Sequence, residues 1–231
     1  MTGIAENLAR VKQQIAQAAE AAGREPESVR LLPVSKTVPS EVLREALVAG
    51  ETRLAENKVQ EAKRKWQEMA DCDVEWAVIG HLQTNKAKDV AEFASEFQAL
   101  DSVRLAQALD TRLQAAGRTL DVLVQVNTSG EESKSGLASH ETLEFLRELP
   151  QFSSLRVQGL MTLAINSPDE DAVRACFRTL RELRDEGAAE NLVGAGELSM
   201  GMSGDFALAI AEGSTCVRVG SAIFGARNYA V

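Results

Sequence analysis

Lys36 directly follows segment 31–35 (LLPVS), whose apolar residues are typical of a buried β-strand. A lysine in this place has its stem in a poorly hydrated environment, and the loss of water favours its neutral amine over the ammonium ion. The lone pair of a neutral amine can attack an aldehyde to form a Schiff base. Because an isolated lysine can equally extend its charge into solvent, Lys36 requires support from other residues.

Glycine and serine residues follow two later β-prone runs, in segments 198–205 (LSMGMSGD) and 217–221 (VRVGS). We expect the first segment to lead into a helix that is capped by Ser203. Glycine allows the backbone to approach an anion closely, and the N-terminus of a helix offers unpaired N–H groups. Ser203 and Gly220, with the glycines around them, therefore predict a phosphate-binding site. Taken alone, Ser203 is equally well explained as a plain helix cap.

Arg218 stands between two valines of a β-prone run, so we expect its side chain to point into the interior. A buried guanidinium needs a partner, and a carboxylate on a neighbouring strand is one explanation. The other is the ring nitrogen of a bound heterocycle. Because arginine only donates hydrogen bonds and keeps its proton, that nitrogen would be unprotonated. A pyridine ring held in this way is a poor electron sink.

Eight β-prone runs alternate with helical segments, a pattern typical of right-handed βαβ units and a parallel sheet. Eight units in 231 residues favour a closed barrel over an open sheet. We therefore predict an α/β fold, a single (β/α)8 TIM-type barrel, that forms one domain over residues 1–231. Apolar residues at helical spacing from Ile4 to Ile15 predict an extra N-terminal helix. The runs are 29–35, 52–55, 74–80, 97–100, 120–126, 155–162, 197–200 and 216–219.

Capping residues mark the expected helix boundaries, because serine accepts hydrogen bonds at helix N-termini and glycine readily ends helices. Ser167, followed by Pro168, predicts the start of a long helix that ends at Gly187. Two further pairs give the same signal: Ser40 with Gly50, and Ser102 with Gly117.

Loops at the C-terminal ends of the strands carry the active site in parallel barrels. Most residues at these positions of the chain are polar, which predicts that they share one site. Asp101 and Asn127 are also explained as simple strand-end caps. The residues concerned are Lys36, Asn57, His81, Asp101, Asn127, Met161, Met200, Arg218 and Gly220.

The composition limits the partners. Asp and Glu outnumber Lys and Arg by 34 to 25, and the net charge of −9 argues against nucleic acid. A local basic run at 58–65, which includes Lys65, is expected to be the solvated face of a helix.

No apolar run is long enough to cross a membrane. Three scattered cysteines and two histidines give no metal-binding spacing, and free thiols of this kind favour the cytoplasm.

Six segments resemble the pyridoxal 5'-phosphate (PLP) homeostasis protein family, and they occur in order over nearly the whole chain. The resemblance implies a barrel similar to the N-terminal domain of alanine racemase, with PLP bound to Lys36 as a Schiff base. The segments are 33–36 (PVSK), 56–61 (ENKVQE), 79–86 (IGHLQTNK), 159–162 (GLMT), 198–203 (LSMGMS) and 217–225 (VRVGSAIFG).

The same resemblance implies roles for other residues. Arg218 would face the pyridine nitrogen, while Ser203 and Gly220 would hold the phosphate. Lys134 matches a further lysine near the site of this family, but it is almost equally explained as a loop lysine in solvent. The residues implied to line the ring are Asn57, His81, Met161, Ser199 and Met200.

Three functions fit these residues. We favour a non-enzymatic, monomeric PLP binder that buffers the cofactor or delivers it to PLP-dependent apo-enzymes. The alternative is a PLP-dependent amino-acid racemase, which needs acid/base groups on both faces of the substrate. Related racemases take a tyrosine for this purpose from an additional C-terminal domain, whereas the single tyrosine here is Tyr229. A third hypothesis is an aldolase that uses Lys36 without a cofactor and has no chromophore.

Overall fold

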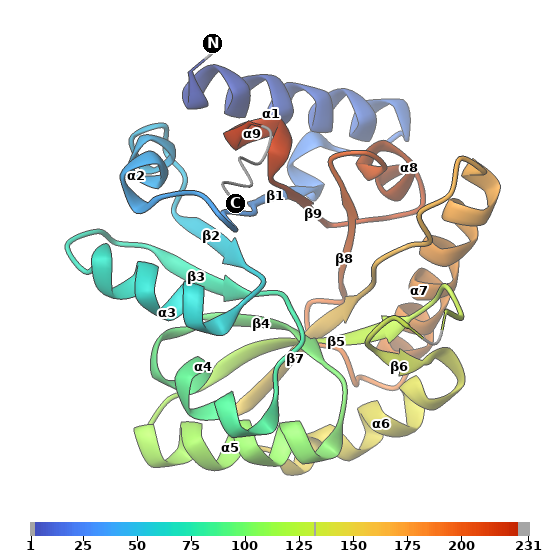
Figure 1. Cartoon of the computed structure of the whole chain (residues 1–231). Coiled ribbons are helices and arrows are strands. Elements are labelled where there is room, and N and C mark those ends of the chain that lie inside the picture. The colour runs from blue at the N-terminus through green and yellow to red at the C-terminus, as the bar shows by residue number, and fades with distance from the viewer. Residues whose placement is uncertain (1–2, 132, 226–231) are drawn as a thin grey trace.

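The computed structural model describes residues 3–131 and 133–225. Its strands form a ring that is surrounded by helices (Figure 1). The strands are β1 (Arg30–Pro33), β2 (Arg53–Glu56), β3 (Glu75–Val78), β4 (Glu96–Leu100), β5 (Leu120–Asn127), β6 (Leu137–Ala138), β7 (Leu155–Met161), β8 (Glu197–Met202) and β9 (Cys216–Val219). Eight of them pair in the order β1-β9-β8-β7-β5-β4-β3-β2, every pairing is parallel, and the two-residue β6 pairs with β5 beside this path.

The ring closes between β1 and β2, just beyond the end of β1. Val34 forms a parallel bridge with Ala55. The Ser35 N–H donates a hydrogen bond to the Ala55 carbonyl at 2.9 Å. The prediction of a (β/α)8 barrel is confirmed, and the seam of the barrel lies directly before Lys36.

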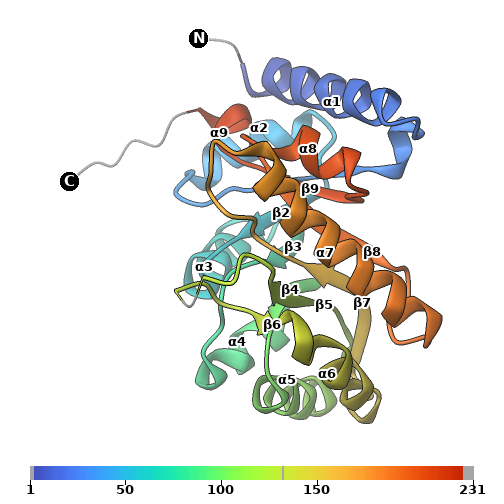
Figure 2. The ribbon, with the colours of Figure 1, turned by 90° about the vertical axis from the view of Figure 1, so that its right-hand side faces the viewer.

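The predicted N-terminal helix is also confirmed, as α1. Its buried residues Leu8 and Val11 pack with Val217 and Val219 of β9, so α1 covers the outside of the barrel near its first and last strands (Figures 1 and 2). No helix in residues 3–131 and 133–225 is long and apolar enough to cross a membrane. The helices are α1 (Ile4–Ala21), α2 (Ser40–Val48), α3 (Val59–Glu68), α4 (Ala87–Phe93), α5 (Val103–Ala116), α6 (Thr142–Glu148), α7 (Glu170–Ala189), α8 (Phe206–Ala211) and α9 (Ser221–Phe224).

The predicted boundaries of α7 are wrong at both ends. Asp169 is the N-cap, and its carboxylate accepts hydrogen bonds from two N–H groups of the first turn. Ser167 instead accepts the Asp169 N–H in the preceding turn. The helix also continues past Gly187, where a side chain would lie 3.2 Å from Leu146 Cδ1. This glycine therefore allows close packing of two helices instead of ending one.

The expected cap of α8 is likewise wrong. β8 continues through a bulge at Gly201, whose φ of 95° is in the left-handed region. A turn follows, in which the Asp205 carboxylate accepts the Met202 N–H at 2.6 Å. Because this turn separates Ser203 from the helix, Asp205 precedes the first residue of α8, and Ser203 remains in the loop.

Candidate functional site

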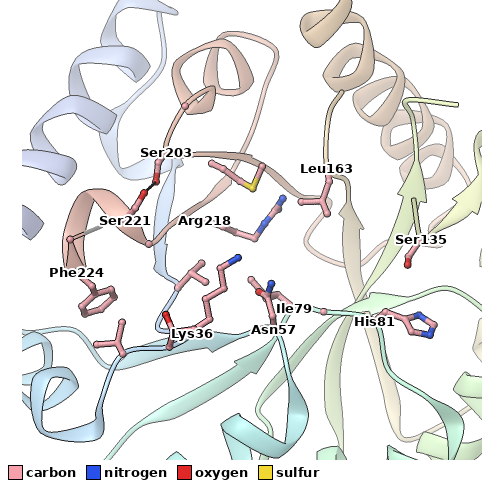
Figure 3. Close-up of a pocket in the computed structure, with 18 of the residues that line it drawn as sticks. Lys36, Asn57, Ile79, His81, Ser135, Leu163, Ser203, Arg218, Ser221 and Phe224 are labelled. Atoms are coloured by element: carbon pink, nitrogen blue, oxygen red, sulfur yellow. Dashed lines mark hydrogen bonds between the residues drawn. The ribbon is translucent and has the colours of Figure 1, made fainter. Parts of the chain in front are cut away.

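A cavity of about 890 Å³ opens at the C-terminal ends of the strands, where parallel barrels carry their sites and within the size range of small-molecule pockets. Six of the nine predicted site residues line it (Figure 3). They come from loops or strand ends that are far apart in the sequence. These six are Lys36, Asn57, His81, Ser203, Arg218 and Gly220.

Lys36 is held in a tight turn that follows β1. The Val38 N–H donates to the Ser35 carbonyl at 3.0 Å. Thr37, the third residue of this turn, has a φ of 67°, as in turns that usually place glycine there. The half-buried Lys36 side chain points into the cavity on the side of Arg218 (Figure 3).

Arg218 is almost completely buried, with 3% of its surface exposed. Its Nη2 donates to the Thr162 carbonyl at 2.7 Å, and its Nη1 donates to Ser199 Oγ at 2.6 Å. Ser199 in turn donates to Gln98 Oε1 at 2.7 Å, and Gln98 donates to the Glu96 carboxylate. Burial lowers the pKa of Arg218 from its ordinary value, but a guanidinium keeps its proton even so. Among the described residues, hydrogen bonds therefore link the cation to a carboxylate by way of two neutral side chains.

Two serines and a glycine form another part of the wall. Ser203 and Ser221 have their hydroxyl oxygens 3.5 Å apart (Figure 3). At Gly220 a Cβ atom would lie 2.9 Å from the Val34 carbonyl oxygen, so the last strand can approach the first only without a side chain. Ser221 ends the segment 217–221 from which the phosphate site was predicted, but no feature of the sequence singled it out as a site residue beside Gly220.

The loops after β3 and β5 form the opposite part of the wall. His81 is 56% exposed, and its Nδ1 lies 3.4 Å from Asp101 Oδ2. Its ring points away from Lys36 (Figure 3). Burial raises the pKa of Asp101, against the effect of the neighbouring His81. Lys134 also lines the cavity, and its Nζ donates to the Ala164 carbonyl at 3.0 Å.

Asn127 stabilises its own loop, since its Oδ1 accepts from Ser129 Oγ and the Gly130 N–H. Its Nδ2 donates to the Glu131 carbonyl at 2.8 Å. These contacts correspond to a strand-end cap. In the part of the chain that the structure describes, no three His, Cys, Asp or Glu side chains are grouped so that they could hold a metal ion.

Three predicted residues are not brought to the cavity wall. Ser199 is fully buried and accepts a hydrogen bond from Arg218, while Met161 and Met200 are buried in the hydrophobic core. The wall contains Leu163 and Met202 instead, both of which are partly exposed. Each lies two residues beyond the methionine that was predicted.

The comparisons with known proteins first define the class. The family model for the alanine racemase N-terminal domain matches residues 7–228. An alanine racemase of Clostridium difficile shares the fold with a TM-score of 0.72 at 15% identity, covering 95% of this chain and 57% of that one. The chain therefore belongs to the alanine racemase N-terminal domain family.

Nearer relatives define the group within that class. Proteins named pyridoxal phosphate homeostasis protein are 43% identical in Pseudomonas aeruginosa and 42% identical in Escherichia coli K12, and the matches cover 98% or more of both chains. The structure of PipY from Synechococcus elongatus PCC7942, with PLP bound, has a TM-score of 0.85 at 35% identity, and the match covers 96% of this chain and all of PipY. The chain is a member of the pyridoxal phosphate homeostasis protein family.

Proposed function

We propose that this chain binds PLP as a Schiff base on Lys36 and acts in PLP homeostasis, as a monomeric carrier that buffers the cofactor or delivers it to PLP-dependent apo-enzymes. One observation carries the proposal: an amine, a buried guanidinium and a pair of hydroxyl groups line the same cavity, on Lys36, Arg218, Ser203 and Ser221. The PLP-bound structure of the related PipY supports it.

The residues present fit the parts of PLP. When bound, PLP supplies an aldehyde that condenses with a primary amine to give a C=N bond and one water molecule. Lys36 provides the amine, and Arg218 provides an N–H donor for the pyridine nitrogen. Ser203 and Ser221 offer hydroxyl donors to the phosphate, and Gly220 leaves the backbone beside them uncovered.

Arg218 favours a carrier over an enzyme. A donor that keeps its proton leaves the pyridine nitrogen unprotonated, which weakens the ring as a sink for the electrons of a carbanion. Exchange of Lys36 for another amine needs no such sink, so release and capture of PLP proceed without catalysis on an amino acid. A racemase also needs a second acid/base group; the single tyrosine, Tyr229, lies outside the described residues. We propose the cytoplasm as the compartment, since the cysteines at 72, 176 and 216 are free thiols.

The test is an absorption spectrum of the purified protein, with and without added PLP, followed by borohydride reduction and peptide mapping. We expect a visible Schiff-base band and a reduced adduct on Lys36. Lys36→Ala should abolish both, whereas the matched variant Lys134→Ala, which changes another lysine of the same cavity, should keep the adduct on Lys36.

Each other outcome is decisive. No band in the presence of excess PLP contradicts the proposal and favours the cofactor-free aldolase. A band together with turnover of an amino acid at enzymatic rates, lost in Lys36→Ala, favours the racemase-type enzyme.

A further inference from the structure

A buried ionic cluster lies behind the turn that carries Lys36. Lys65 of α3 and Glu56 at the end of β2 have exposed side-chain fractions of 1% and 0%. Glu61, one turn before Lys65 on the same helix, is 19% exposed. Burial of charged groups is costly unless each one is paired and hydrogen-bonded. None of the three lines the cavity, so the site described above does not account for them.

Lys65 makes three hydrogen bonds, which use all three protons of its ammonium group. Its Nζ donates to Glu56 Oε1 at 2.6 Å and to Glu61 Oε1 at 2.8 Å. The third acceptor is the Ser35 carbonyl, at 2.7 Å. That carbonyl belongs to the peptide bond that precedes Lys36.

Glu61 makes the corresponding contact on the other side of Lys36. Its Oε1 accepts the Thr37 N–H at 2.7 Å, and that N–H belongs to the peptide bond that follows Lys36. Burial by itself would raise the pKa of Glu61, but hydrogen bonds from Lys65 and the Thr37 N–H lower it below its ordinary value. The acceptor therefore stays ionised, and such charge-assisted hydrogen bonds are among the stronger ones.

The conformation of Thr37 explains why the turn needs these contacts. A φ of 67° is unfavourable for a β-branched residue. Such a conformation persists only where the surroundings impose it. Among the described residues, the side chain that accepts the Thr37 N–H is that of Glu61.

We propose that Lys65 and Glu61 are positioning residues for Lys36: they hold the peptide groups on both of its sides and so direct its amine into the cavity. The inference rests on the proposed role of Lys36 as the residue that binds PLP. Small displacements of a reacting group reduce rates strongly, so a turn released from Glu61 should form its Schiff base at least ~10-fold more slowly.

The experiment measures the rate of Schiff-base formation after mixing PLP-free protein with PLP. Glu61→Ala should lower this rate about 10-fold or more, and Glu61→Gln should restore most of it because its amide oxygen can still accept the Thr37 N–H. Lys63→Met is the matched control. Lys63 lies on the same helix and pairs with Asp89 and Glu92, away from the turn, so its loss should leave the rate unchanged.

A second variant tests whether the effect passes through the turn. Glycine adopts a positive φ without strain. In a Thr37→Gly background, Glu61→Ala should therefore cost a smaller factor in rate than it does in the wild type. An equal factor in both backgrounds contradicts the inference.

A third measurement needs neither a variant nor the cofactor. In PLP-free wild-type protein, hydrogen exchange should show a protected amide at Thr37, although this residue is exposed. Free exchange at this amide, or wild-type rates in Glu61→Ala, overturns the inference while the role of Lys36 stands. Failure of the wild type to form any Schiff base instead contradicts the proposed function.

Discussion

Ser199 is fully buried and joins Arg218 to Gln98, so it fixes the direction of a guanidinium without lining the cavity itself. Its hydroxyl accepts on one side and donates on the other, and this sets the orientation of the neighbouring amide. The hydrogen-bonded chain ends at Glu96, which is also paired with Arg30. Among the described residues, Arg218 donates hydrogen bonds to a hydroxyl and a carbonyl but directly to no carboxylate, so N–H groups of the guanidinium remain for an acceptor in the cavity.

Ser199→Ala tests this arrangement. The substitution leaves Arg218 Nη1 and Gln98 Oε1 without their hydrogen bond in the interior, which should lower the free energy of unfolding by about 1–3 kcal/mol. It should also weaken PLP binding, because Arg218 is no longer held in one direction. Denaturant unfolding and PLP titration measure the two effects.

The control for this variant is Ser214→Ala. Ser214 is equally buried, and among the described residues its hydroxyl has only backbone carbonyls as hydrogen-bond acceptors, those of Leu198, Met200 and Cys216. It should therefore lose stability but keep PLP affinity. Equal affinity in both variants and the wild type would show that the orientation of Arg218 does not depend on Ser199.

Among individual residues, the sequence identifies most of the chemically distinctive side chains but not their burial. Lys65 was expected on the solvated face of a helix, yet it is buried against Glu56. The basic run around it is typical of an exposed helix, and its buried partners come from β2 and the turn after β1. Such pairings depend on tertiary contacts, which single-sequence periodicity does not contain.

Among the elements, the close contact of β9 with the end of β1 determines the geometry of the site. Gly220 stands where β9 ends, and its lack of a side chain lets the Val34 carbonyl lie beside it. The two strands carry Arg218 and, just after β1, Lys36. The distance between the two strands therefore sets how far the proposed contact of Arg218 with the pyridine ring lies from the proposed bond of Lys36 with the aldehyde.

Gly220→Ala should push these strands apart. Its Cβ would lie 2.9 Å from a backbone oxygen that cannot rotate away, and we expect a loss of about 1–3 kcal/mol in stability with weaker PLP binding. Gly3→Ala is the control, because a Cβ there has no heavy atom within 4 Å among the described residues, its φ of −69° suits any side chain, and Gly3 does not line the cavity. Thermal unfolding and PLP titration should separate the two variants. Equal stability and equal PLP affinity of the two variants would contradict the role of the close contact between β9 and the end of β1.

The strands themselves were predictable because each apolar run is short and bounded by polar or turn residues. The exact ends of the strands and helices were less predictable. The bulge at Gly201 carries β8 on to Met202, and alternation along a regular strand gives no sign of it. Ser167 and Asp169 are both good helix caps, and only the path of the chain decides that Asp169 accepts the first N–H groups.

For the molecule as a whole, α1 connects the N-terminal segment to the last elements of the barrel. Leu8 is 2% exposed within the cluster that joins α1 to α8, β9 and α9. Asn7 Nδ2 adds a hydrogen bond to the Ile223 carbonyl at 2.8 Å. The helix thereby supports the segment that contains Arg218 and Gly220, although it lies on the outer surface.

Leu8→Ala should leave an empty space in this buried cluster and so reduce the free energy of unfolding by about 2–5 kcal/mol. The space left by the truncated side chain would lie beneath β9 and α9, and β9 carries Arg218. PLP affinity should therefore fall as well. Val48→Ala removes an apolar side chain that is 90% exposed and should change neither quantity. Urea unfolding monitored by circular dichroism and a PLP titration provide the comparison; an unaltered midpoint for Leu8→Ala would contradict the role of α1.

The pairing of the first strand with the last has a consequence for the order of biosynthesis. Lys36 follows β1, whereas Arg218 lies in β9 and Gly220 directly follows it, and β1 pairs with β9 although one is the first and the other the last strand of the described chain. Domains emerge from the ribosome with their N-terminal parts first. A nascent chain therefore carries the amine long before it carries the residues that complete the cavity, and a truncated translation product has the lysine without the rest of the site. The proposed capture of PLP by this cavity would thus be restricted to chains whose synthesis has passed the ninth strand.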